Sequence, residues 1–90
     1  MSAPTLFDLA GGGTALLLSL DGEFVTVLAP QASPPGSSLA IGFEGQTLTI
    51  KVRGSRRVEP DDAGRTFRVE GRFVSLSRAQ RLALTAKGPA

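Results

Sequence analysis

The segment that most constrains the fold is residues 66–87, because its hydrophobic period changes near the middle from that of a strand to that of a helix. In its first half, polar residues alternate with an apolar or small set that consists of Phe67, Val69, Gly71 and Phe73. Successive side chains of a β-strand point to opposite faces of the sheet. The pattern therefore predicts a half-buried antiparallel strand with its charged face in water.

The second half predicts a capped helix over residues 77–87. Ser77, followed three residues later by Gln80, has the form of a capping box. The Lys-Gly-Pro sequence that closes the segment suits the last turn and the end of a helix. The apolar face expected at helical spacing consists of Leu76, Ala79, Leu82, Ala83 and Ala86. Such a helix needs a sheet to lie on, and it would cover one end or an open flank of a barrel.

The sequence before residue 66 has five further stretches typical of strands. Asp21-Gly22 and Glu44-Gly45 are hairpin turn signals between them, and Gly54 indicates a bulge or bend. The expected strands are residues 7–10, 14–20, 23–29, 39–43 and 46–53, the last with an extension toward 59. Six short antiparallel strands curl into a small barrel or sandwich, because an open sheet would leave unpaired edges. We therefore predict a mostly β fold, a six-stranded antiparallel β-barrel with one C-terminal α-helix, in a single domain over residues 1–90.

The composition argues against catalysis. The chain has no histidine and no cysteine, so thiolate metal sites and the usual general base at neutral pH are excluded. The adjacent acids Asp61 and Asp62 lie in a predicted turn, where Asp is favoured for backbone reasons. Asp21 and Glu44 likewise belong to hairpin turns. We therefore expect a protein that is not an enzyme and that needs no metal or cofactor.

The charges are divided between the two halves of the chain. Residues 1–50 have four acidic and no basic side chains, a net charge of −4, whereas residues 51–90 have ten basic and four acidic side chains, a net charge of +6. Such asymmetry can mark a surface for phosphates or acidic partners, although solvated strand and helix faces give the same pattern. The amino terminus does not resemble a secretory signal, and no apolar run is long enough to span a bilayer. We expect a soluble, cytoplasmic protein without membrane insertion.

Residues 7–16, with the sequence FDLAGGGTAL, resemble the segment of PilZ domains that reads [Asp/Asn]-x-Ser-x-x-Gly before a strand. The order of the later loop, hairpin, strand and helix is also similar to that family, so the resemblance covers about residues 7–87. It implies a six-stranded barrel and, in many members, a cyclic di-GMP site. By resemblance, Asp8 and Gly13 would match the ligand-binding motif, while Ala10 stands where the serine belongs.

The arginine clamp of the family is missing. In PilZ domains that bind cyclic di-GMP, an Arg-x-x-x-Arg segment precedes the first strand, but here no Arg or Lys precedes residue 51. The spacing does occur later, at Arg53 with Arg57 and at Arg68 with Arg72. Residues four apart on a strand share a face, so the second pair is expected on the solvent side. The first pair would share a face only without a bulge at Gly54.

These patterns favour a divergent PilZ-like domain that lacks the standard cyclic di-GMP site. By resemblance, it would act as an adaptor or regulator that binds another protein of a bacterial motility, type IV pilus or cyclic di-GMP signalling pathway. The candidate partner-binding residues lie on the basic strand and on the helix: Arg65, Arg68, Arg72, Arg78 and Arg81. Two alternatives stay open, a cyclic di-GMP receptor with an unorthodox site and a small basic barrel that binds nucleic acid. The second is less favoured because the chain has no Tyr or Trp for stacking. Self-association into a homo-oligomer also stays open.

Overall fold

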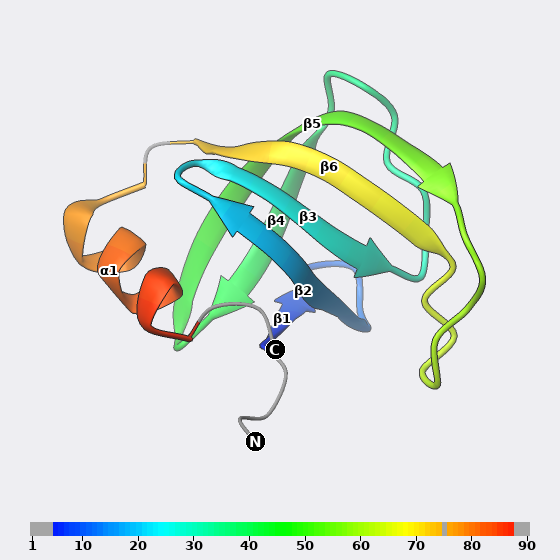
Figure 1. Cartoon of the computed structure of the whole chain (residues 1–90), viewed down its shortest axis with the longest axis horizontal. Helices are drawn as coiled ribbons and strands as arrows, with labels where there is room; N and C mark the ends of the chain where they lie inside the picture. The colour runs from blue at the N-terminus through cyan, green and yellow to red at the C-terminus, as the bar shows by residue number, and fades with distance from the viewer. Residues whose placement is uncertain (1–4, 75, 88–90) are drawn as a thin grey trace.

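The computed structural model describes residues 5–74 and 76–87 and confirms the predicted barrel (Figure 1). Six antiparallel strands form one closed sheet in the order β1-β2-β3-β6-β5-β4, followed by one helix. The elements are β1 (Leu6–Leu9), β2 (Thr14–Asp21), β3 (Phe24–Ala29), β4 (Ser38–Phe43), β5 (Gln46–Arg57), β6 (Phe67–Val74) and α1 (Arg78–Lys87). No helix in these described ranges is long and apolar enough to cross a bilayer.

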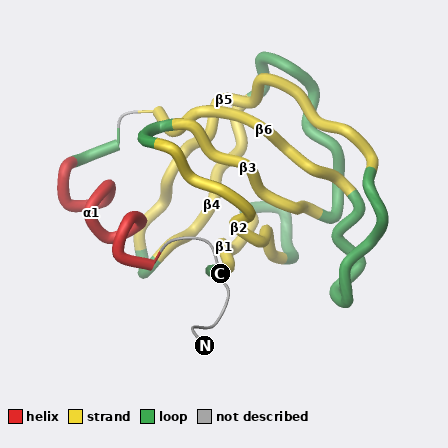
Figure 2. The backbone as a smooth tube through the Cα atoms, viewed as in Figure 1, coloured by secondary structure: helices red, strands yellow, loops and turns green. Residues whose placement is uncertain are grey.

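The topology includes a Greek key. Strands β4, β5 and β6 are joined in sequence as antiparallel neighbours. Residues 30–37 connect β3 to β4, but β3 pairs with β6, at the other side of this group. The barrel closes where β1 pairs with β4, with Asp8 opposite Gly42 and Leu9 opposite Ile41. The two ends of the barrel therefore differ, with α1 at one and the long loops at the other (Figure 2).

Both predicted hairpin turns exist, one of them shifted by one residue. Glu44 and Gly45 have φ angles of 50° and 77°, and they join β4 to β5 as the two residues of a tight turn. Between β2 and β3 the turn residues are Gly22 and Glu23, because Asp21 still pairs with Phe24. The predicted turn at Asp21-Gly22 was wrong by that single position.

The core fills the inside of the barrel with side chains from every strand. The ring of Phe7 is fully buried and meets Phe43 and Phe73 edge to face, with ring centroids 5.5 Å and 6.4 Å apart. The predicted alternation of β6 is confirmed, since Val69, Gly71 and Phe73 are buried and Phe67 is half-buried. Gly71 is required there, because a Cβ atom would lie 2.5 Å from the carbonyl oxygen of Lys51.

Helix α1 begins with the predicted capping box. The Ser77 amide donates to Gln80 Oε1 at 2.9 Å, and the Gln80 amide donates to Ser77 Oγ at 3.1 Å. Gln80 Nε2 also donates to Gln46 Oε1 at 2.7 Å, and Arg81 forms an ion pair with Glu23 at 3.1 Å. Gln46 follows the β4–β5 turn and Glu23 lies in the β2–β3 turn, so the helix covers that end of the barrel.

The predicted apolar face of the helix was partly wrong. Leu84, which was not assigned to it, is fully buried, while Leu82 is 65% exposed and Ala79 is exposed. Leu76 and Ala83 do pack against the core. The helix is therefore rotated relative to the expectation, because its position over the barrel end selects the side that carries Leu84. The side chain of Ala86, and Gly88 and Pro89, lie outside the described part of the chain.

Candidate binding site: a basic face on β3, β6 and β5

The outer surface of β3, β6 and β5 brings like charges together. Strand β6 lies between the other two and pairs with both. Arg72 lies opposite Lys51 of β5, and Arg68 lies opposite Arg56. Like charges directly opposite each other on one face of a sheet destabilise it. Two such pairs on neighbouring strands indicate a surface that is suited to an anion.

The strand register arranges the outward side chains in three rows. The two outer rows each have one apolar and two basic side chains, and the middle row has an acid and no base. The first row contains Phe24, Arg72 and Lys51; the middle row contains Thr26, Glu70 and Gly54; the third row contains Leu28, Arg68 and Arg56. We call these nine residues, together with Arg53, the basic face.

A β-bulge adds Arg53 to this face. The register of β5 against β6 shifts between Val52 and Gly54, so the predicted bulge is confirmed and Arg53 is the additional residue. The Arg53 guanidinium carbon lies 5.9 Å from the centroid of the Phe24 ring, within the range of a cation–π contact. Arg57 lies opposite Phe67 and belongs to the other side of the strand. Arg53 and Arg57 therefore form no pair.

The first row borders an open pocket of about 270 Å³, lined by Phe24, Lys51, Val52, Arg53 and Arg72. Three cationic side chains and one aromatic ring that is 51% exposed meet there. Guanidinium groups bind carboxylates and phosphates in a planar, bidentate manner, and lysine binds them as a point charge. This pocket can therefore hold an anionic group beside an apolar or aromatic one.

A second open pocket, of about 210 Å³, borders the third row and is lined by Gly54, Ser55, Arg56, Arg68 and Glu70. Nε of Arg68 is buried and has no hydrogen-bond partner within the described residues. Glu70 Oε1 lies 3.7 Å from it, too far for a hydrogen bond but close enough for an ion pair. Glu70 therefore partly compensates the charge of Arg68 and places one negative charge between the two basic rows.

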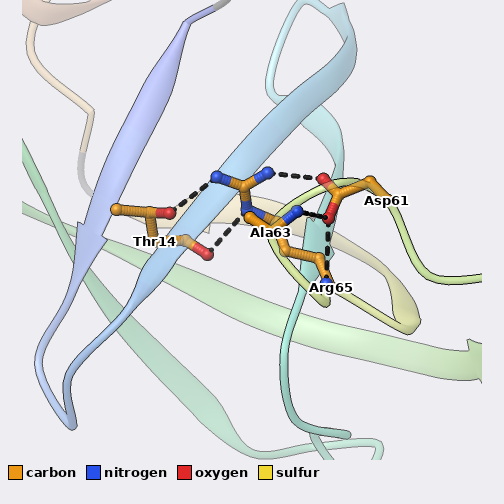
Figure 3. Close-up of polar contacts among 4 residues, drawn as sticks. All are labelled: Thr14, Asp61, Ala63 and Arg65. Carbon is orange, nitrogen blue, oxygen red and sulfur yellow. Dashed lines mark hydrogen bonds and ion pairs between the residues drawn. The ribbon is translucent and has the colours of Figure 1, made fainter.

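Arg65, a predicted partner-binding residue, lies outside the basic face. Its side chain is buried and fastens the β5–β6 loop to the start of β2 (Figure 3). Nε donates to the Thr14 carbonyl oxygen at 3.1 Å, and Nη2 donates to Thr14 Oγ1 at 2.7 Å. Nη1 forms an ion pair with Asp61. Because these donors bind within the barrel, Arg65 has a structural role, and the structure does not place it with Arg68 and Arg72 on the strand surface to which the sequence assigned it.

Asp61 organises the same loop, as its place in a turn predicted. Its Oδ1 accepts hydrogen bonds from the backbone amides of Ala63 and Arg65, at 3.0 Å and 2.9 Å. The Arg65 amide is the largest influence that lowers the pKa of Asp61, and the Arg65 guanidinium lowers it further, whereas partial burial acts in the opposite direction. The net effect is a pKa below the ordinary value, so this carboxylate is ionised at neutral pH.

The two helix arginines also lie apart from the basic face. Arg78 is exposed at the first turn of α1, and Arg81 contacts Glu23 at the β2–β3 turn. Both belong to the element that covers the barrel end. Of the five predicted partner-binding residues, only Arg68 and Arg72 belong to the basic face as defined above.

The residues matched to the PilZ motif lie at the opposite end of the barrel from α1. Ala10 lines a pocket of about 300 Å³ between the β1–β2 turn and the loop after β3, and every lining residue of that pocket is uncharged. Asp8 and Gly13 are not among those residues. Asp8 instead lies against Gly42, and a Cβ atom added to Gly42 would be 3.4 Å from the Cβ atom of Asp8. The three motif residues therefore do not converge on one pocket.

Sequence reasoning missed Phe24, Lys51 and Arg56 as members of the site. The alternation in β5 did indicate that Lys51 faces solvent, but its pairing with Arg72 depends on the register between strands. Arg56 joins the outer face only because the bulge adds one residue before it. Comparison of the chain with family models, curated proteins and solved structures gave no match.

Proposed function

We propose that this chain is a non-enzymatic adaptor that binds an acidic segment of another protein through its basic face. The observation that carries the proposal is the pair of like-charge rows, Arg72 opposite Lys51 and Arg68 opposite Arg56. Each like-charge pair destabilises the free protein, by less than about 1 kcal/mol because solvent screens these largely exposed side chains. A carboxylate between the two cations of a row offsets this repulsion with two attractions.

The shape of the surface favours a protein partner over a nucleic acid. Nucleic-acid platforms stack several bases on aromatic rings. Within the described residues, Phe24 is the one exposed ring, since Phe7, Phe43 and Phe73 are buried and Phe67 is half-buried. Glu70 in the middle row would also repel a continuous phosphate backbone. The resemblance to PilZ domains suggests that the partner belongs to a bacterial motility or cyclic di-GMP signalling pathway.

A second candidate is a nucleotide receptor, with cyclic di-GMP as the first ligand to test. The specific observation in its favour is the pocket where the exposed ring of Phe24 adjoins Lys51, Arg53 and Arg72. A base could stack on the ring while the cations hold phosphate. This site would differ from the family's, because it lies on β3, β6 and β5 and not near Asp8.

The proposal is tested by fluorescence anisotropy with labelled polyglutamate, and the double variant Lys51→Glu/Arg56→Glu is compared with the wild type. The matched control is Arg57→Glu/Arg78→Glu, which changes the net charge equally but lies outside the basic face. We expect saturable binding that weakens with salt, a loss of about tenfold or more in the first variant and little change in the control.

Equal losses in both double variants would show a non-specific effect of net charge and would overturn the proposal. Calorimetric titration with cyclic di-GMP separates the second candidate. Tight cyclic di-GMP binding that is lost in Phe24→Ala, without polyglutamate binding, would replace the adaptor function with a receptor function.

A further inference from the structure

The basic face alternates in charge along the strand direction, and this pattern limits which acidic segments fit. Arg72, Glu70 and Arg68 follow one another on the outward side of β6, so their charges run plus, minus, plus. The flanking strands reinforce the pattern, because Lys51 and Arg56 lie beside the two arginines. Gly54 lies beside Glu70, and no atom comes within 4 Å of a Cβ placed there.

From this pattern we infer that the basic face recognises an extended segment with acidic residues four positions apart and a basic residue midway between them. The inference rests on the proposed function and names the chemistry of its partner. In an extended chain every second side chain points to the same side, with a rise of about 3.3 Å per residue. Residues i, i+2 and i+4 of the partner therefore reach the first, middle and third rows in turn.

The two acidic positions are held by the outer rows. The rows of Arg72 and Arg68 are four residues apart along β6, a separation of about 13 Å for an extended strand. Acidic side chains at i and i+4 of an extended partner have the same separation, because the repeat of the two chains is the same. One carboxylate then lies between Lys51 and Arg72, and the other lies between Arg56 and Arg68.

The middle position is where specificity arises. An acid at i+2 would face the Glu70 carboxylate, whereas Lys or Arg there would pair with it, and the open space over Gly54 admits a long side chain. Discrimination of this kind comes from repulsion against the wrong partner as well as attraction to the right one. A nucleic acid cannot satisfy this row, because each nucleotide brings a phosphate.

The experiment uses labelled, Thr-rich peptides of identical composition, which contain two Asp residues and one Lys. In the matched peptide the Asp residues are four apart with Lys midway; in the scrambled peptide the Asp residues are two apart and Lys follows. We expect the protein to bind the matched peptide about tenfold more tightly than the scrambled peptide in anisotropy titrations. Glu70→Gln should remove most of this preference and should strengthen polyglutamate binding, whereas Glu59→Gln, in the exposed loop after β5, should do neither.

The outcomes separate the inference from the proposed function. If both peptides bind equally while polyglutamate still binds and depends on Lys51 and Arg56, the spacing rule is wrong and the adaptor function stands. If neither the peptides nor polyglutamate bind, both are wrong. Tighter binding of single-stranded oligothymidylate than of any peptide, lost in Phe24→Ala, would overturn both in favour of a nucleic-acid surface.

Discussion

Arg56→Glu should stabilise the free protein even though it damages the proposed binding surface. Arg56 lies directly opposite Arg68 across the β5–β6 pair. A glutamate at this position would turn a repulsive cross-strand pair into an attractive one, and it would offer an acceptor to the buried Nε of Arg68, which has no hydrogen bond in the described structure. Stability and binding would then change in opposite directions.

The magnitude follows from the geometry of the pair. A cross-strand pair of opposite charge contributes about 0.2–1 kcal/mol, and a like pair in the same position is destabilising. The Arg68 side chain is 43% exposed, so solvent screens the interaction and reduces the combined change. We expect the free energy of unfolding to rise by about 0.5–1 kcal/mol, which corresponds to about 2–8 °C in Tm for a domain of this size.

Thermal and urea unfolding, followed by circular dichroism, measure this change. Arg57→Glu is the control, because it makes the same substitution on the same strand but lies opposite Phe67 and not opposite a cation. The gain of Arg56→Glu over Arg57→Glu should shrink in about 1 M salt, where the screening length is about 3 Å. An equal effect of the two substitutions, or a gain that salt does not reduce, would refute the account of opposed charges.

Three further predictions concern the barrel itself. Leu84→Ala should lower the free energy of unfolding in urea by about 2–5 kcal/mol, because the Leu84 side chain is fully buried. Leu82→Ala should change this free energy by less than about 0.5 kcal/mol, because Leu82 is 65% exposed. Similar losses of stability in the two variants would mean that the helix is oriented differently. Gly71→Ala should cost about 2 kcal/mol or more, because its Cβ would lie 2.5 Å from a backbone carbonyl oxygen of β5, and a wild-type Tm would contradict this close approach. Asp61 has a pKa below its ordinary value, so its stabilising interaction with Arg65 should be present at neutral pH and be lost as the pH falls through and below about 3.9. The Tm of the wild type should therefore approach that of Asp61→Asn in acid. A difference in Tm that stays constant with pH would argue against this linkage.

Local patterns in the sequence were sufficient to predict most of the fold. The alternation in β6, the turn at Glu44-Gly45 and the capping box of Ser77 and Gln80 each depend on residues within one short segment. The face of the helix was harder to predict. Leu82 and Leu84 are two residues apart and lie on different sides of α1, and only the position of the helix over the barrel end decides which one is buried.

The candidate site could not be predicted from the sequence because it depends on how separate strands pair with one another. Strand β3 has apolar residues on both faces, with Phe24 and Leu28 outward and Val25 and Val27 inward, so its own sequence does not show that Phe24 is exposed. The like-charge rows require the pairing of β5 with β6 and the one-residue shift at the bulge. Arg65 shows the opposite error, since it was a candidate for partner binding but is held within the barrel. Its guanidinium binds the Thr14 carbonyl oxygen, which is distant in the sequence, and the Asp61 carboxylate of its own loop.

The most direct test of the central claim is to locate the bound acidic peptide by amide NMR shifts. When the peptide with Asp residues four apart and Lys midway is titrated into the labelled protein, we expect the largest shifts at Phe24, Lys51, Arg56, Arg68 and Arg72, which lie on three adjacent strands. Little change is expected near Ala10 and Pro30, at the uncharged pocket of the barrel end. Shifts centred on that pocket or on α1, with the basic face unaffected, would contradict the assignment of the basic face as the binding site.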